Sequence, residues 1–197
     1  MSSFTLDAAE ELTASSKLDV SGKFHCIVKN VEVNPVLGDT MIRGFRAEIE
    51  VISPKEHAEK TCNLLFANGD LSHKDKGEFA KTKQTAFCIA TNLIDFTALG
   101  KSTEIDLDNA VNQHVLIEIE QKPDRKDPTK IYPELRYSNI FHVDDPRAKT
   151  YPRDENAIKL TGATRRPAEY FDAVAKKKPA SGGNKSEQVT DDDLAGL

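Results

Sequence analysis

The chain of 197 residues contains no tryptophan and lacks the features that mark membrane and secreted proteins. No stretch approaches the roughly 20 consecutive apolar residues that a membrane-spanning helix needs. Residues 1–19 contain neither the basic start nor the apolar segment of a signal peptide. Cys26, Cys62 and Cys88 form an odd, widely spaced set among apolar neighbours, which favours small buried side chains over a disulfide framework. We therefore expect a soluble protein without membrane attachment, with the cytoplasm as its default compartment.

Motifs of catalysis are also missing. The sequence has no glycine-rich phosphate loop, no nucleophile elbow and no HExxH motif. Its five histidines show no metal-ligand spacing with one another or with the cysteines. His142 with Asp144 and Asp145 can be read as a cation site, but a turn after a strand is the commoner meaning of such a group. Glu118 and Glu120 are expected on the outer, solvent-exposed face of a strand. The sequence therefore predicts a protein that is not an enzyme and has no metal or other cofactor. A metal-dependent nuclease would need clustered carboxylates, which the sequence does not show.

The formal net charge of -5 is unevenly distributed. Residues 186–197 contain four acidic residues and no lysine or arginine, so residues 1–185 together carry a formal charge of -1. A nearly neutral body can still present a basic face, so the acidic balance of the whole chain does not exclude an anionic partner.

Short stretches in which apolar and polar residues alternate predict five strands. In the second stretch, Phe45, Ala47 and Ile49 fall on one face, whereas Arg46 and Glu48 fall on the other. The expected strands are 22–33, 42–52, 61–67, 115–120 and 134–143, with a turn at 37–39 and a charged, proline-containing loop at 121–130.

The period changes between the third and fourth strands. From Phe79 to Ile94, apolar residues recur at steps of three and four, which predicts an amphipathic helix that closes over a sheet. After the fifth strand, we expect irregular structure with a short extended piece at 157–160, then a helix from Pro167 through Val174. Tyr151 and Tyr170 are expected to pack this C-terminal segment onto the sheet.

The order of three strands, one helix and two strands is that of the OB-fold, a five-stranded, partly open barrel. We therefore expect a mainly β, OB-fold-like barrel with one helix between strands three and four. The runner-up is another α+β sandwich with one covering helix. The expected division is a flexible lead-in at 1–20, the barrel domain at 21–145, a segment with a short helix at 146–178 that packs on the barrel, and a disordered linker and acidic tail at 179–197.

This order, followed by the ending Ser186–Leu197, resembles phage-encoded single-stranded-DNA-binding proteins and the bacterial proteins of that class. The opening Ser21–Val28 further resembles the first strand of an uncharacterised phage family suspected of the same role. The resemblance implies an OB domain, a flexible linker and an acidic tip, and it covers residues 20–145 at the level of pattern. Bacterial tips typically end in a bulky aromatic residue, whereas this chain ends in Leu197, and it lacks the tryptophan that many such proteins use for stacking.

A protein that holds a single strand needs positive charge along the phosphates and flat rings against the bases. Phe24, Phe45 and Phe66 share faces with aliphatic residues and are expected in the core. The loop 122–130 holds the densest group of cations, and Tyr132 is favoured over Tyr137 as a stacking ring. The nucleic-acid-binding candidates are Lys23, Lys29, Arg43, Arg46, Lys122, Arg125, Lys126, Lys130, Tyr132, Arg136 and Tyr137, with Arg165 and Arg166 as further cations.

The acidic tip has two coherent roles beside that of a plain solubilising tail. It can dock on a basic, partly apolar pocket of a replication or recombination protein, or it can occupy the chain's own basic groove when DNA is absent. The residues of this partner-binding tail are Asp191, Asp192, Asp193, Leu194 and Leu197.

Two hypotheses follow from the sequence. The first is a non-catalytic protein that binds single-stranded DNA in phage replication or recombination, and it is compatible with a homo-oligomer. It predicts that Arg43, Arg46, Arg125, Lys126 and Arg136 converge on one concave face. The second is an OB-like module that binds protein without binding DNA, for which scattered basic residues are expected.

Overall fold

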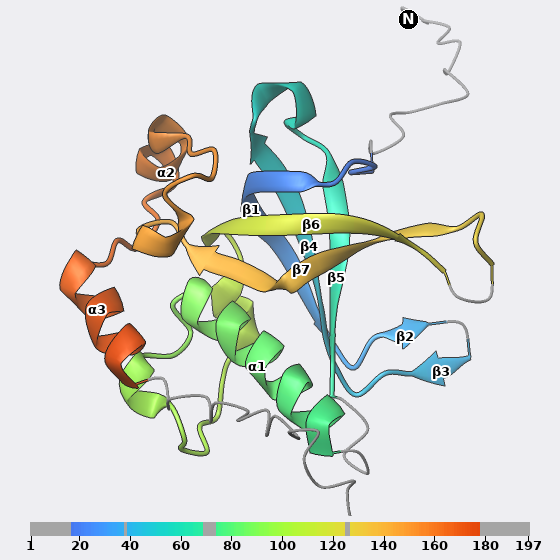
Figure 1. Ribbon diagram of the computed structural model, residues 1–197, viewed down its shortest axis with the longest axis horizontal. Coiled ribbons are helices and arrows are strands. Elements are labelled where there is room, and N and C mark those ends of the chain that lie inside the picture. The colour runs from blue at the N-terminus through green and yellow to red at the C-terminus, as the bar shows by residue number, and fades with distance from the viewer. Residues whose placement is uncertain (1–16, 38, 69–73, 125–126, 178–197) are drawn as a thin grey trace, which may run out of the picture.

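One antiparallel sheet of five strands organises the molecule (Figure 1). The computed structural model describes residues 17–37, 39–68, 74–124 and 127–177. The strands follow the order β5-β4-β1-β6-β7, so that the first strand of the chain is the central one. Their bounds are β1 Gly22–Val33, β4 Gly44–Ser53, β5 Thr61–Ala67, β6 His114–Pro123 and β7 Ile131–His142.

The five strands predicted from alternation are therefore confirmed, with shifted ends. β4 begins at Gly44 rather than at 42, and β6 and β7 extend into the predicted loop, where Lys122 pairs with Tyr132. A separate two-stranded hairpin, β2 Val36–Leu37 and β3 Thr40–Met41, surrounds the predicted turn and was not expected. Two-residue strands are too short to show a periodic pattern, so no alternation indicates this hairpin.

The two edge strands, β5 and β7, approach each other without pairing, so the sheet is not a closed barrel. Helix α1, Lys74–Ala90, lies beside both strands (Figure 1). It satisfies carbonyl groups along the edge of β5: Lys83 Nζ donates to the Leu65 carbonyl at 3.0 Å, and Gln84 Nε2 donates to the Phe66 carbonyl at 3.0 Å. The prediction of a mainly β fold is confirmed, and the prediction of an OB-like barrel is not.

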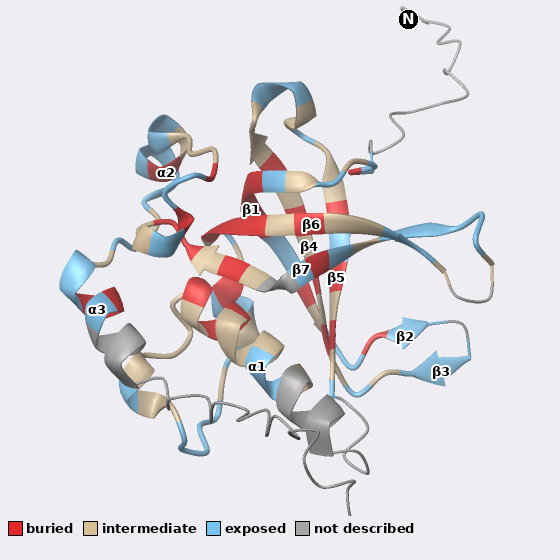
Figure 2. Ribbon diagram, viewed as in Figure 1, coloured by how far each residue is buried: buried red, intermediate tan, exposed pale blue. Residues whose placement is uncertain are grey.

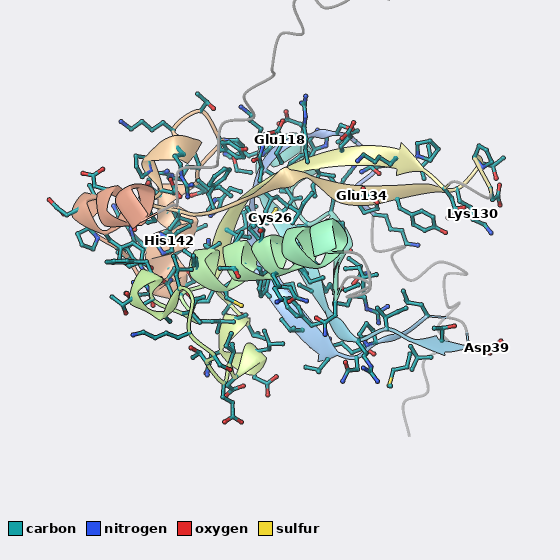
Figure 3. The ribbon with its side chains drawn as sticks, turned by 60° about the horizontal axis from the view of Figure 1, so that its bottom comes forward. Cys26, Asp39, Glu118, Lys130, Glu134 and His142 are labelled. Atoms are coloured by element: carbon teal, nitrogen blue, oxygen red, sulfur yellow. The ribbon has the colours of Figure 1, made fainter. Side chains whose placement is uncertain are left out.

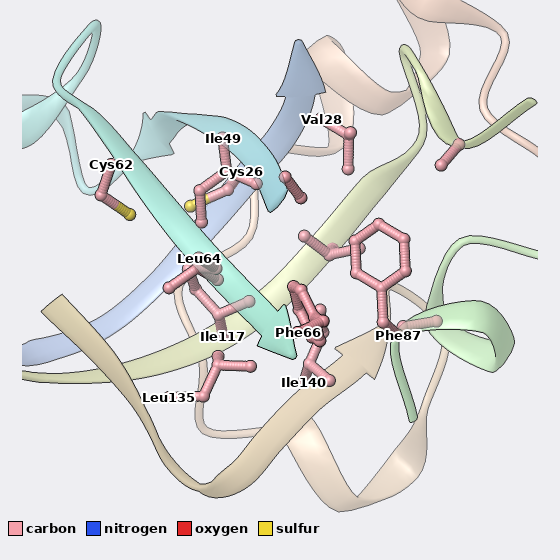
Figure 4. Close-up of a cluster of buried hydrophobic side chains, with 14 of the residues drawn as sticks. Cys26, Val28, Ile49, Cys62, Leu64, Phe66, Phe87, Ile117, Leu135 and Ile140 are labelled. Atoms are coloured by element: carbon pink, nitrogen blue, oxygen red, sulfur yellow. The ribbon is translucent and has the colours of Figure 1, made fainter. Parts of the chain in front are cut away.

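An aromatic cluster joins the helix to the sheet. Phe45 and Phe66 stack with their ring centroids 4.7 Å apart, and Phe87 of α1 lies 5.1 and 4.8 Å from them. Phe24 is also buried, so the expectation that the phenylalanines of the strands belong to the core is confirmed. Figure 4 shows Phe66 and Phe87 within this cluster, together with aliphatic residues from several strands.

The three cysteines are buried and free, as the sequence predicted. Cys26 and Cys62 point into the same cluster (Figure 4). Burial raises the pKa of the Cys62 thiol to about 12 and that of Cys88 to about 11, so both remain protonated thiols at neutral pH.

Helix α1 begins five residues before the predicted start and ends four residues before the predicted end. The end is set by Asn92, whose φ of 62° is left-handed and stops the helical path. Asparagine is a common residue at such a position, so this signal was present in the sequence.

Residues 17–20, which precede β1, are held against the sheet and are not a flexible lead-in. Leu18 is buried, and its N–H donates to the Thr61 carbonyl at 2.8 Å. The Gln121 side chain donates to the carbonyl groups of Leu18 and Val20 at 3.0 and 3.3 Å. Residues 17–20 therefore belong to the folded domain, and the prediction that the whole of 1–20 is a flexible lead-in is wrong for these four.

The C-terminal segment packs on the sheet, with a short 3-10 helix at Pro146–Ala148, then α2 Glu155–Thr161 and α3 Ala168–Lys177 (Figure 1). Tyr151 is buried and its hydroxyl donates to Glu118 Oε2 at 3.2 Å, and the Tyr170 hydroxyl accepts the Phe96 N–H at 3.2 Å. The predicted packing on the sheet is confirmed for Tyr151, whereas Tyr170 packs against Phe96 in the 3-10 helix Phe96–Ala98. Among the helices of the described ranges, none has the length and apolar character to cross a membrane.

The short extended piece predicted at 157–160 is wrong, because these residues lie in helix α2. Asp154 caps this helix: its side chain accepts the N–H groups of Asn156 and Ala157, both at 2.9 Å. Gly162, with a φ of 66°, ends the helix. The cap and the terminating glycine outweigh the apolar residues that resembled a strand.

We expect Phe87→Ala to lower the free energy of unfolding by about 3–5 kcal/mol, because it leaves a cavity between the helix and the two rings of the sheet. Urea denaturation followed by circular dichroism measures the change. Leu160→Ala is the control, since Leu160 is 87% exposed and its loss should change stability by less than about 0.5 kcal/mol. Equal effects of the two substitutions would contradict the role given to Phe87.

Candidate nucleic-acid interface

Two hairpins project from the same side of the sheet (Figures 1 and 3). We call residues 33–43 the β2–β3 arm and residues 120–134 the β6–β7 arm. Both are largely exposed in Figure 2. Of the seven exposed large apolar side chains in the described ranges, six lie on the arms and the seventh, Leu160, lies on α2. The six are Val33, Val36, Leu37, Met41, Ile131 and Tyr132.

The β2–β3 arm is fixed at its base by an asparagine and a glycine. The Asn34 N–H donates to the Gly44 carbonyl at 2.8 Å, and the Gly44 N–H donates to Asn34 Oδ1 at 3.1 Å. Gly44 has a φ of 129°, and a Cβ atom there would lie 2.3 Å from the Phe66 carbonyl oxygen. Only glycine fits this conformation, so the direction of the arm is set by the backbone and not by contacts of its tip.

The β6–β7 arm continues the ladder of the main sheet to its tip. Beyond the pair of Lys122 with Tyr132, the Asp124 N–H donates to the Lys130 carbonyl at 2.7 Å. The Asp127 side chain accepts from the Thr129 hydroxyl at 2.5 Å and from the Thr129 N–H at 3.2 Å. The hydroxyl, then Lys130 and then this N–H hold the pKa of Asp127 below its ordinary value. Arg125 and Lys126, two of the predicted cations, lie outside the described residues.

Most of the predicted cations are paired with acids. Surface pairs of this kind contribute only about 0–1 kcal/mol each, so a phosphate group can replace the carboxylate at low cost. The exposed pairs are Lys29 with Glu50 at 3.4 Å, Arg46 with Glu32, Lys122 with Glu134 at 3.2 Å and Glu120 at 3.6 Å, and Lys130 with Asp127 at 3.3 Å. Arg136 pairs at 3.1 Å with Glu118, which is less exposed than the other acids.

The structure gathers some of the predicted cations and separates others. Arg43 is exposed at the base of the β2–β3 arm, and Lys122 and Lys130 lie on the β6–β7 arm. Arg46 lies opposite Glu32 near the end of β1, whereas Arg136 binds Glu118, which lies opposite Lys23 at the start of β1. Arg46 and Arg136 are therefore not brought together on one face.

The remaining predicted cations lie against the C-terminal segment. Lys23 Nζ donates to Thr150 Oγ1 at 3.2 Å and lies 4.9 Å from the centre of the Tyr151 ring. Arg165 binds Asp144 at 2.6 Å, and Arg166 donates to Asn92. Their contacts hold the protein's own segments together. The side chain of Tyr137 and the whole predicted tail, residues 191–197, lie outside the described part of the chain.

Glu118 is much less exposed to solvent than the sequence predicts. Its side chain is only 15% exposed, and it accepts hydrogen bonds from Asn139 at 2.8 Å, Arg136 at 3.1 Å and Tyr151 at 3.2 Å. Burial disfavours the charged form, but these donors outweigh it and lower the pKa of Glu118. An irregularity in the pairing of β6 with β7 at this point places Arg136 and Asn139 around one carboxylate, and no sequence pattern indicates it.

The acids of the cation site considered at the end of the last strand bind arginine side chains instead. Asp144 binds Arg165, and Asp145 binds Arg147 at 2.6 Å while it caps the 3-10 helix that follows. Within the described ranges, no group of three or more histidine, cysteine or acidic side chains is placed to hold a metal ion.

A polar hollow of about 370 Å³ lies at the C-terminal end of α1. Its lining includes the acids Glu104 and Asp106 and the amides of Asn92, Asn109 and Gln113. The acids disfavour an anionic ligand there, so the hollow does not compete with the arms as a site for phosphates.

We expect Gly44→Ala to displace the β2–β3 arm, because the added methyl group collides with the Phe66 carbonyl. Gly100→Ala is the matched control: Gly100 also has a positive φ, of 82°, but nothing lies within 4 Å of its Cβ position. The control should lose about 1 kcal/mol of stability from backbone strain, and Gly44→Ala should lose distinctly more. Thermal denaturation measures both, and similar losses would contradict the collision.

The chain matches no protein-family model, no curated protein and no solved structure with which it was compared. Its function is therefore inferred from the arms and from the side chains that they present.

Proposed function

We propose that this protein binds single-stranded DNA without catalysis, in the cytoplasm, during phage DNA replication or recombination, and that the strand lies between the two arms. The observation that carries the proposal is the concentration of exposed apolar and aromatic side chains on these arms. Apolar groups in water have a free-energy cost, and such groups on two projecting hairpins favour a surface that a ligand covers.

The chemistry of the arms suits an unpaired strand. Tyr132, half exposed, offers a ring on which a base stacks, and such stacking contributes roughly 1–3 kcal/mol per base in any sequence. Met41 and Ile131, both 61% exposed, offer further apolar contacts to the bases. Lys122 and Lys130 lie beside them for the phosphates, in pairs that are easily exchanged.

The element order supports the same proposal. In an OB-fold, the loops between strands one and two and between strands four and five border the nucleic-acid site. By position along the chain, the β2–β3 arm and the β6–β7 arm correspond to these two loops. We infer that the open sheet is an OB-like barrel whose gap is filled by α1. The acidic tail is proposed to recruit replication or recombination partners, or to compete with DNA.

We expect Tyr132→Ala to weaken the binding of a labelled poly-dT oligonucleotide about 5- to 150-fold, which corresponds to the loss of one stacked base. Fluorescence anisotropy measures the affinity. Leu160→Ala, the change of an exposed apolar residue outside the arms, should leave it unchanged. If the Tyr132 variant binds with wild-type affinity, Tyr132 is not part of the binding site.

The contact with phosphates predicts that binding weakens steeply as salt increases. Substitution of Lys122 by Gln should flatten the slope of log affinity against log salt by about 0.7, the value for one contact with a single strand. Lys29→Gln removes a cation from β1, away from the arms, and should leave the slope as it is. A common effect of both variants would indicate nonspecific attraction by total charge.

A second candidate function is the binding of a protein partner on the same arms. The pairing of most of the predicted cations with acids favours it, since a neutral, apolar surface suits a protein better than a phosphate chain. Absence of oligonucleotide binding by the wild-type protein at low salt would sink the DNA-binding proposal and leave this second function.

A further inference from the structure

Three histidines are buried where the C-terminal segment meets the sheet. His25 of β1, His114 of β6 and His142 of β7 are each at most 2% exposed. They come from three neighbouring strands (Figure 1). The segment 144–164 covers them, since Asp154, Thr161 and Thr164 hydrogen-bond to the three rings. Figure 3 shows His142 near the end of its strand, on the side away from the arms.

The hydrogen bonds of His25 fix where its proton lies. Its Nδ1 atom receives the Asp154 N–H at 3.1 Å. A backbone N–H can only donate, so Nδ1 carries no proton and Nε2 does. Nε2 then donates to His114 Nδ1 at 2.9 Å.

Hydrogen-bond donation continues in the same direction through His114. Because its Nδ1 accepts, its Nε2 carries the proton and donates to Thr161 Oγ1 at 2.8 Å. The Thr161 hydroxyl in turn donates to the Ala157 carbonyl at 3.1 Å. This chain begins at the residue that caps α2 and ends at the last residue of that helix, so two neutral histidines hold both ends of α2.

His142 repeats the arrangement for the rest of the segment. Its Nδ1 accepts the Asp144 N–H at 3.0 Å, and its Nε2 donates to the Thr164 carbonyl at 3.0 Å. A protonated imidazole is a donor at both nitrogens. Protonation of any of the three rings would therefore place an N–H group at Nδ1 against the N–H group that now donates to it.

Both acidic and basic groups surround the rings. His25 faces His114, Asp154 and Arg153, and His114 also faces Asp154. Burial is the largest influence and lowers the pKa of both rings, that of His25 from 6.5 to about 4.

His142 faces Asp144, whose carboxylate lies 3.7 Å from its Nδ1, and also Arg165 and Arg166. Burial again lowers the pKa most, and Asp144 acts in the opposite direction. Since Arg165 and the Arg166 N–H already bind this carboxylate, its charge is largely compensated.

We propose that His25, His114 and His142 form an acid-sensitive latch, which releases the segment 144–164 from the sheet as the pH falls while the sheet itself stays folded. Release exposes the apolar contact of Leu116 and Val143 with Ile158. The latch lies away from the arms and does not depend on what they bind.

The sign of the effect follows from proton binding. The neutral form is favoured while the segment covers the three rings, so the state in which the segment is released binds more protons below about pH 6.5. The stabilisation by the latch is complete above about pH 6.5 and is lost as the pH falls toward about 4. The carboxylates Asp144 and Asp154 have lowered pKa values and lose their charge only at still lower pH.

Hydrogen–deuterium exchange of the full chain at about pH 7 and about pH 4.5, corrected for intrinsic rates, tests the latch. We expect the protection of 144–164 to fall at least about tenfold at the lower pH, while β4 and β5 remain protected. Retained protection of the segment, or its loss together with that of the strands, would overturn the proposal.

Variants sharpen this test. In His142→Asn, the amide oxygen can accept the Asp144 N–H at any pH, so release should require more acid; His57→Gln, which changes a histidine outside the latch, should behave as wild type. If the Asn variant does not fold, the ¹⁵N shifts of the wild-type rings decide. Nε2-protonated rings that titrate as the segment's amides shift support the latch, and a protonated Nδ1 at neutral pH overturns it.

Discussion

The contact of Phe87 with the stacked rings of Phe45 and Phe66 holds helix α1 in the opening between the two edge strands. Without the helix, β5 and β7 would present unpaired backbone groups to water and to other chains. Lys83 and Gln84 can reach the carbonyls of β5 only because the aromatic contact fixes the rotation and position of α1. The covering of the core and the protection of the sheet edge therefore depend on the same three rings.

The two arms differ from the rest of the structure because they contribute little to the core. An isolated two-stranded hairpin is at best marginally stable in water, so the β2–β3 arm depends on its base at Asn34 and Gly44. The β6–β7 arm extends a ladder that already belongs to the sheet. Their directions are fixed by the protein alone, so under the proposed function the arms lose little conformational entropy on binding.

The strands and their faces were predictable, because alternation over several residues reports directly which side of a strand is buried. Local signals also mark the end of α1, near Asn92, and the whole of α2, between Asp154 and Gly162, and at both places they override the apolar periodicity. The contacts of Glu118 and the histidine network were not predictable. They join residues far apart in sequence through an irregular strand pair and a packed segment, and only the fold determines such neighbours.

The central position of β1 has a consequence for synthesis. This strand is synthesised before the strands that flank it, and its partner β6 begins only at residue 114. Until then one edge of an apolar strand stays open, and its contacts with β6 require the closure of a long loop, which is slow. The nascent chain therefore carries an unpaired, aggregation-prone edge until β6 has been synthesised, and a chaperone that binds β1 early would raise the yield of folded protein.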